Sequence, residues 1–245
     1  MNKQNNKIKT RNVNALIIAL IIVYFTILAN GEPAGPTISY VSNSTSANAG
    51  NGTLQSGDEG GYITTITLDV LQQNFGWKAY VGNVTGKLTL DDADNYTIYD
   101  WSIANLNAEV YISRNQTIDW TNIGCAARSI IEAQDTDLGK DPSADDDSIN
   151  LTFDGAVHDD LIIGGNPALT TCPTISTFVN DTAQSALFQE MLLNDSQQRL
   201  VYATIAEDDA DGYRNGTTFD FQAIVPDTLS TATTTNYYFF VEIGN

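Results

Sequence analysis

The strongest constraint on the fold of this chain is a regular alternation of apolar and polar residues. The alternation occurs in runs at residues 66–70, 84–90, 99–103, 219–225 and 237–243. Side chains of a β-strand point alternately to its two faces, so runs of this kind, rich in β-branched and aromatic residues, indicate half-buried strands. Together with the apolar runs between them, they predict roughly ten to twelve strands and an all-β fold, an antiparallel β-sandwich of Ig-like or jelly-roll-like type.

Two local features refine this prediction. A turn cluster at Asn194–Ser196 separates apolar runs at residues 187–193 and 200–205, which predicts a β-hairpin. Residues 126–138 break the alternation and predict a short helix or helical turn.

The N-terminal residues differ sharply from the rest. Residues 3–11 include four basic residues, the apolar stretch Ala15–Ala29 follows, and small residues precede a potential cleavage point after Gly31. This order is typical of a secretory signal peptide, and an uncleaved membrane anchor through residues 15–29 is the alternative. In both cases we expect the body to be extracellular, either secreted or held at the cell surface.

These features divide the chain into three parts. Residues 1–31 are the signal peptide or anchor. Residues 32–61 are expected to form a flexible segment rich in Gly, Ser and Asn, with a short strand at Thr37–Val41. Residues 62–245 are expected to form the β-sandwich domain.

The charge of the chain restricts its partners. After residue 31, seven basic residues stand against thirty acidic ones, a net charge of −23. Such a surface repels nucleic acid and anionic lipid, so we predict no nucleic-acid partner and no membrane contact beyond residues 15–29.

The chain has two cysteines, Cys125 and Cys172. In an oxidising compartment a lone pair of this kind predicts a disulfide. The alternative is a thiolate nucleophile, which would need a base, and the only histidine is His158.

N-glycosylation sequons are unusually frequent. They occur at Asn43, Asn51, Asn83, Asn95, Asn115, Asn150, Asn180, Asn194 and Asn215. Random placement of the same residues would give about three sequons, so we predict that several of these sites carry glycans. The alternative is that a composition rich in Asn and Thr produces them by itself. At Asn83 and Asn150 a strand would turn the sequon outward and the residue between its Asn and Thr inward.

Two acidic clusters are candidate calcium sites. Glu207, Asp209 and Asp211, followed by Gly212, match the first half of an oxygen-rich calcium loop, but Thr218 stands where the helical version of this loop has a bidentate glutamate. The second cluster spans residues 135–147, with its glycine out of register. Calcium is therefore a candidate cofactor, and solvated acidic turns are the alternative.

The sequence has no Gly-x-Ser-x-Gly elbow, and a Ser-His-Asp arrangement would have to use His158. A carboxylate pair for glycoside hydrolysis is compatible with thirty acidic residues. We predict that the chain is not an enzyme and keep a secreted hydrolase as an alternative. Trp77, Trp101 and Trp120 could form a sugar-binding platform, but their strand-like surroundings favour the core.

The segment Trp77–Leu90, with Tyr99-Asp100-Trp101 and Phe219–Gln222, resembles uncharacterised secreted β-rich surface proteins of archaea. The likeness covers most of residues 62–245, and its motifs are structural. It implies a cell-surface location, N-glycans and assembly into a layer or filament.

Three functions compete on these observations. We favour a structural surface glycoprotein that associates with itself or with the cell envelope. The alternative is an extracellular module that binds glycans or a protein, with calcium as a candidate requirement, and the third function is the secreted hydrolase. A specific mode of assembly would add the segment Thr37–Val41 to a sheet edge of a neighbouring subunit. The alternative is that this segment pairs within its own subunit.

Overall fold

The computed structural model describes residues 32–42, 74, 76–94, 96–102, 108–182, 184–228 and 235–243. Strands account for 40% of the described residues and helices for 10%, which confirms the all-β prediction. The predicted signal peptide or anchor, the run at residues 66–70 and three of the sequons (Asn43, Asn51 and Asn95) lie outside the described residues. None of the described helices has the length and apolar character needed to span a bilayer.

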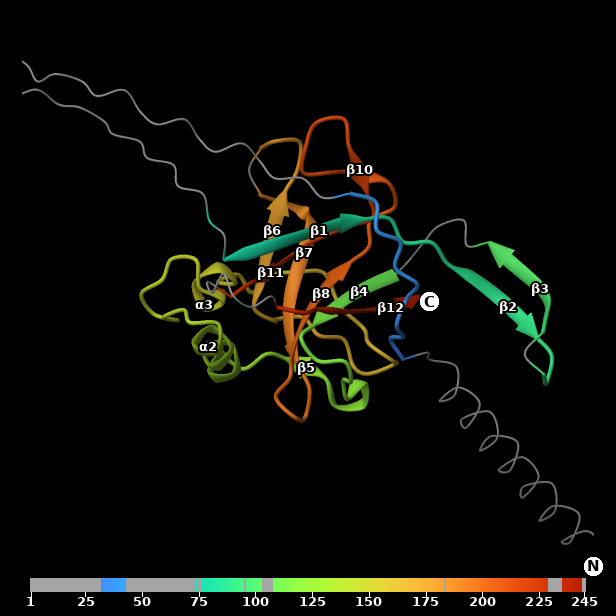
Figure 1. Ribbon diagram of the computed structural model, residues 1–245, viewed down its shortest axis with the longest axis horizontal. Coiled ribbons are helices and arrows are strands. Elements are labelled where there is room, and N and C mark those ends of the chain that lie inside the picture. Colours follow the sequence, from blue (N-terminus) through green and yellow to red (C-terminus); the bar gives the residue numbers. More distant parts are fainter. Residues whose placement is uncertain are drawn as a thin grey trace, which may run out of the picture.

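The centre of the molecule is a six-stranded antiparallel sheet (Figure 1). Four strands follow the order β12-β4-β8-β7, and two short strands, β5 and β6, pair with the remaining edge of β7. The strands are β4 (Ala108–Ser113), β5 (Gly124–Cys125), β6 (Thr174–Phe178), β7 (Gln184–Asn194), β8 (Leu200–Ile205) and β12 (Tyr238–Ile243). Strands β5 and β6 thus act as one interrupted edge strand.

Strands β7 and β8 form the hairpin predicted from the sequence, with Asn194 opposite Leu200. Asp195 builds the turn, because its side chain accepts hydrogen bonds from the backbone N–H groups of Gln197 and Arg199 at 2.9 and 3.0 Å. An aspartate in this position folds the backbone back on itself, so a residue of the predicted turn cluster fixes the register of the apolar runs on either side of it.

One face of the six-stranded sheet is covered by a second sheet and two helices. These elements are β1 (Trp77–Gly82), β11 (Phe221–Pro226), α2 (Arg128–Asp137) and α3 (Ile149–Thr152). Ile112, Leu192 and Tyr202 of the large sheet are buried beneath them, together with Ile131 of α2 and Val225 of β11. Helix α2 confirms the helix predicted at residues 126–138.

The opposite face is covered by loop segments rather than by a sheet. Leu161 and Ile163, from the connection between α3 and β6, pack with Trp120 of a short 3-10 turn, η1 (Trp120–Asn122), against Tyr111 of the sheet. Trp120 is buried, as predicted. The large sheet is therefore enclosed on both sides.

Two small hairpins form separate two-stranded sheets. One consists of β9 (Ala210–Asp211) and β10 (Thr218–Phe219), and the other of β2 (Lys87–Asp91) and β3 (Thr97–Ser102).

The strand expected at Thr37–Val41 is not formed, so this prediction was wrong. Of residues 32–42, Ala34 pairs with β12, where Ala34 and Val241 exchange two backbone hydrogen bonds of 3.0 and 2.8 Å. The apolar side chains of the expected strand are between 64% and 92% exposed. Residues 37–41 are rich in β-forming residues, but within the described part of the chain the pairing with β12 stops at Ala34, and a strand needs a neighbour for its backbone hydrogen bonds.

Candidate functional site: an exposed aromatic hairpin

The β2–β3 hairpin is organised by Asp92. Its side chain accepts hydrogen bonds from the backbone N–H groups of Asp94 and Tyr96, both at 2.9 Å, and its own N–H donates to the carbonyl oxygen of Tyr96. Aspartate favours such turns because its short side chain reaches the backbone two residues ahead. The strands leave the turn antiparallel, with Leu90 opposite Tyr99.

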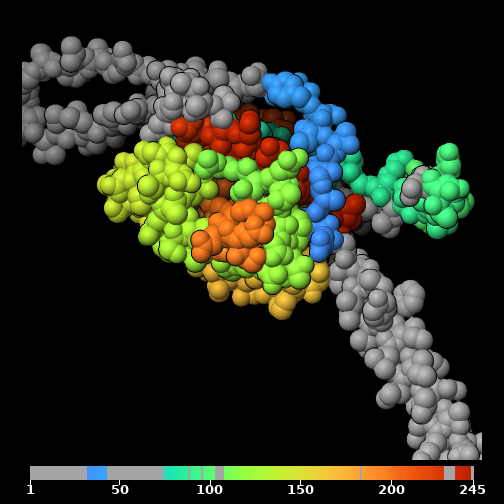
Figure 2. All heavy atoms as spheres, turned by 60° about the horizontal axis from the view of Figure 1, so that its bottom comes forward, coloured from blue at the N-terminus to red at the C-terminus, as the bar shows by residue number. Residues whose placement is uncertain are grey.

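The hairpin exposes its apolar side chains. Tyr99 and Trp101 have ring centroids 4.6 Å apart and are 56% and 48% exposed, and Leu90 is 50% exposed. No described side chain of β3 is buried. The prediction that Trp101 belongs to the core was therefore wrong. In the ribbon and space-filling views the hairpin projects from the body (Figure 1, Figure 2).

The internal contacts of the hairpin are few. Within the described part of the chain, β2 and β3 pair only with each other. Lys87 forms an exposed ion pair with Asp100 at 2.6 Å, and the hydrogen bond from Lys87 lowers the pKa of the Asp100 carboxyl. Exposed ion pairs contribute little to stability, and an isolated two-stranded hairpin is marginal in water. Covering its apolar face with a partner surface would stabilise it considerably.

The N-terminal segment borders the same side of the molecule. Figure 2 shows residues 32–42 (blue) on the side of the body from which the hairpin (green) projects. Ile38, Tyr40 and Val41 of this segment are exposed. Exposed apolar side chains thus gather on one side, where no other described element covers them.

The six described sequon asparagines fall into different environments. Asn83 and Asn215 are exposed. The side-chain N–H groups of three others donate hydrogen bonds, Asn150 to the carbonyl of Pro142, Asn180 to the carboxylate of Asp211 and Asn194 to the carbonyl of Asp195. Asn115 is half-buried.

The strand context predicted for two of these sequons holds only in part. Asn83 and Thr85 are exposed while Val84 packs against the core, but the three residues follow the end of β1. Asn150 lies in helix α3 instead of a strand, so that prediction was wrong. Asp135 explains the difference, since its buried carboxylate accepts hydrogen bonds from the backbone N–H groups of Ile149 and Asn150, at the start of the helix.

The candidate calcium ligands Glu207, Asp209 and Asp211 lie between β8 and β10. In the part of the chain that the structure describes, no three His, Cys, Asp or Glu side chains are grouped so as to hold a metal ion. The carboxylate that organises this region is Asp220, which the sequence analysis did not single out. Its two carboxylate oxygens accept hydrogen bonds from the backbone N–H groups of Asp209 at 3.0 Å and Val84 at 2.7 Å.

Cys125 and Cys172 form the predicted disulfide, with their Cα atoms 4.7 Å apart. Cys125 is the last residue of β5, and Cys172 lies two residues before β6 begins. The bond therefore joins the two halves of the interrupted edge strand beside β7.

Both ring nitrogens of His158 are bound to the backbone next to this disulfide. Nε2 accepts the N–H of Cys172 at 2.8 Å, so the proton is on Nδ1, which donates to the carbonyl of Asp159 at 2.7 Å. With the ring buried, the geometry gives His158 a structural role in holding the loop.

A pair of carboxyl groups that the sequence did not reveal lies across β4 and β12. Glu109 is directly opposite Glu242. Burial, followed by the charge of Glu242, raises the pKa of Glu109 to about 7. Glu242 accepts hydrogen bonds from the N–H of Gly164 at 2.8 Å and the hydroxyl of Tyr111 at 3.2 Å. Alternation in the sequence is enough to place both acids on one face of the sheet. Their partial burial is evident only in the structure, where the loop that contains Gly164 lies over that face.

No protein-family model matches the chain, and the searches of curated proteins and of solved structures found no match either.

Proposed function

We propose that this chain is an exported, N-glycosylated structural protein of the cell surface, and that it assembles with copies of itself through the β2–β3 hairpin. The observation that carries the proposal is the exposed group of Leu90, Tyr99 and Trp101 on an element that has no covering layer among the described residues. Contiguous apolar surface of this kind marks interaction sites, whereas single exposed apolar residues are ordinary.

A second copy of the chain is the partner that the structure favours. Within the described residues, the outer edge of β12 is paired only at Ala34, which leaves backbone groups available to an added strand. The outer edges of β2 and β3 are likewise unpaired among the residues that the structure describes. A contact between the hairpin of one molecule and the β12 edge of the next is head-to-tail, and unless its rotation closes a ring it grows into a filament or layer.

Several features of the body support a role outside the cell. The disulfide is of the kind that persists in oxidising compartments, and two sequon asparagines, Asn83 and Asn215, are exposed for modification. Helix α3 and the hydrogen bond from Asn150 to Pro142 make Asn150 a poor acceptor in the folded protein. The β1–β11 sheet packs over one face of the large sheet, which supports the sandwich class.

Size measurements on the mature protein test the assembly. We expect light scattering after gel filtration to show high-mass species, favoured by salt because screening reduces the repulsion between acidic copies. Replacing both hairpin aromatics (Tyr99→Ser with Trp101→Ser) should leave a folded monomer. The matched control is Phe178→Ser, since Phe178 is 55% exposed but lies on β6 of the body. Assembly by the double variant equal to that of the wild type would refute the proposal.

Deletion of residues 32–42 tests the part played by the N-terminal segment. If this segment exchanges between copies, the truncated protein should stay folded and monomeric. If the same high-mass species still forms, the exchange is excluded and the hairpin acts without it.

A further inference from the structure

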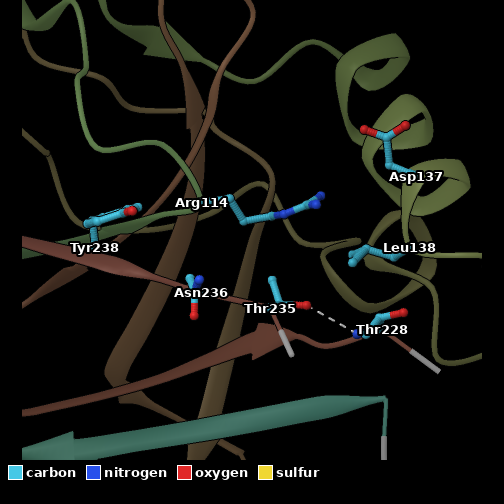
Figure 3. Close-up of a pocket in the computed structure, with 7 residues that line it drawn as sticks. All are labelled: Arg114, Asp137, Leu138, Thr228, Thr235, Asn236 and Tyr238. Atoms are coloured by element: carbon cyan, nitrogen blue, oxygen red, sulfur yellow. Dashed lines mark hydrogen bonds between the residues drawn. The ribbon is translucent and has the colours of Figure 1, made fainter. Parts of the chain in front are cut away.

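A polar pocket lies on the body, between β4, α2 and the start of β12. Its volume is about 350 Å³. The polar and aromatic groups that line it come from distant parts of the sequence: Arg114, Asp137, Thr228, Thr235, Asn236 and Tyr238. Figure 3 shows the guanidinium of Arg114 reaching across the pocket, with Asp137 on one side and Thr235 on the other.

Arg114 differs from the other basic residues of the described chain. Lys78, Lys87, Lys140 and Arg199 form ion pairs, Arg128 donates to the carbonyl of Asn150, and Arg214 lies over the ring of Tyr213. Within the described residues, the Arg114 side chain has no hydrogen bond, ion pair or ring contact. Its charge acts on the hydroxyls of Tyr202 and Tyr237, where it opposes the rise in pKa that burial causes. The chain has thirty acidic residues. Among the basic side chains that the structure describes, the one without a hydrogen bond, ion pair or ring contact is Arg114, which lines the pocket.

The wall of the pocket is held in place from behind. Asp227 accepts the backbone N–H groups of Thr228 at 2.9 Å and Thr235 at 3.3 Å, and it forms an ion pair with Lys78 at 2.9 Å. Lys78 also donates to the carbonyl of Thr235 at 3.1 Å. Rigid walls lower the entropy lost when a ligand binds.

We propose that this pocket binds a neutral saccharide of one or two hexose units. Vicinal sugar hydroxyls both donate and accept hydrogen bonds. The pocket offers a guanidinium that only donates, a carboxylate that only accepts, and the amide of Asn236 that does both. Tyr238, 38% exposed, provides a ring on which the C–H face of a sugar can lie.

The charges of the pocket favour a neutral ligand over an ion. Arg114 disfavours a cation, while Asp137 and the net charge of the chain disfavour an anion. The volume lies near the lower end of the range for ligand pockets, which suits a small saccharide. For recognition, the pocket need only orient the saccharide.

Protein-observed NMR titration with single sugars tests this proposal. The probes are neutral hexoses, N-acetylhexosamines and their disaccharides, with glucuronic acid and glucosamine as charged comparisons. We expect at least one neutral sugar to shift signals of pocket residues saturably, with a dissociation constant of about 1 mM, which is typical of so small a polar ligand. Added salt should change this affinity little, because the ligand is uncharged.

Substitutions locate the site. Arg114→Gln and Tyr238→Ala should each weaken binding about tenfold or more, with the fold checked by thermal unfolding. Arg214→Gln is the matched control, because Arg214 also lies beside a tyrosine but outside the pocket. The proposal is overturned if no neutral sugar binds saturably, if only charged sugars bind, or if both pocket variants bind as well as the wild type.

The hairpin variant separates this inference from the proposed assembly. The double variant at Tyr99 and Trp101 should bind the sugar as the wild type does, because neither residue lines the pocket. Loss of assembly with retained sugar binding supports both proposals, and each can fail without the other.

Discussion

The body and the β2–β3 hairpin of this protein share the same alternation of apolar and polar residues, but only in the body are the apolar side chains covered. In the body, alternating residues such as Leu192 and Tyr202 lie under a second layer and are essentially inaccessible to solvent. In the hairpin, Tyr99 and Trp101 alternate just as regularly, yet they remain about half exposed. Apolar burial is the main favourable contribution to folding, so the apolar side chains of the body stabilise the monomer. Those of the hairpin can contribute fully only in contact with another molecule.

The polar groups of the two regions differ in the same way. Glu190, fully buried in β7, accepts the backbone N–H of Ile224 in β11 at 2.8 Å, and burial raises its pKa well above the ordinary value. This bond ties the two sheets of the body together. The hairpin instead has the exposed pair of Lys87 and Asp100, which links its two strands to each other and to nothing else described.

The largest expected effect concerns the disulfide of the body. Replacing Cys125 and Cys172 together by alanine should lower the free energy of unfolding by about 4 kcal/mol, because the bond closes a long loop in the unfolded chain. Chemical denaturation of the variant and the wild type without reductant measures the difference. A change below about 1 kcal/mol would show that the interrupted edge strand holds together without the bond.

A pair of leucine substitutions compares the two regions directly. Leu192→Ala should cost about 3 kcal/mol of unfolding free energy, since it leaves a cavity in a core that excludes solvent. Leu90→Ala, at a half-exposed position of the hairpin, should cost well under 1 kcal/mol in the monomer. Urea unfolding of both variants at low protein concentration measures the contrast. Equal costs would mean that the hairpin is covered in solution.

The sequence was informative about strands and much less so about what covers them. Alternation predicted the strands that contain Trp101 and Phe239, and the aspartates and asparagines between the runs predicted the turns. Alternation shows which side chains share a face, but the layer over that face comes from elsewhere in the chain. For this reason alternation alone predicts a core position for Trp101, which the structure shows to be half exposed. The same limit applies to Asn150, for which alternation predicts a strand. The helix there starts at a hydrogen bond from the N–H of Asn150 to the carboxylate of Asp135, and alternation does not reveal such a contact.

The candidate sites show the same limit. The cysteine count, together with the oxidising compartment that the sequence predicts, was sufficient to predict the Cys125–Cys172 bond, because only one pairing exists. The pocket around Arg114 could not be predicted, since its walls come from four separate stretches of the chain and its arginine has no distinguishing neighbours in the sequence. The calcium prediction for Glu207, Asp209 and Asp211 followed the spacing of acidic residues, and spacing does not show where carboxylates point.

The carboxyl pair of the body gives a pH-dependent effect of intermediate size. The pKa of Glu109 rises from 4.5 to about 7 on folding, so the folded state holds this proton more tightly than the unfolded state. Stability should therefore fall as pH rises from about 4.5 to about 7 and level off above that. Glu109→Gln should remove this part of the pH dependence and stabilise the protein above pH 7 by about 1 kcal/mol, allowing for solvent screening at a half-buried position.

Thermal or urea unfolding of both proteins across this pH range checks the effect. Because other buried acids, Glu190 and Glu242 among them, also have raised pKa values, the informative quantity is the difference between variant and wild type at each pH. A difference that does not change with pH would contradict the assignment to Glu109.

The smallest effect is expected in the hairpin, where it is also the most informative. Trp101→Ala removes the largest apolar side chain of β3, a change that typically costs 3 to about 5 kcal/mol in a core. Here the ring is 48% exposed and its one described ring contact is Tyr99, so we expect the monomer to lose less than about 0.5 kcal/mol of unfolding free energy. The same substitution should nevertheless weaken assembly, since the indole would be buried only between molecules. Measuring both quantities on one preparation distinguishes a binding surface from a poorly packed part of the fold. A large loss of monomer stability would place Trp101 in the fold after all, and the comparison between body and hairpin would no longer hold.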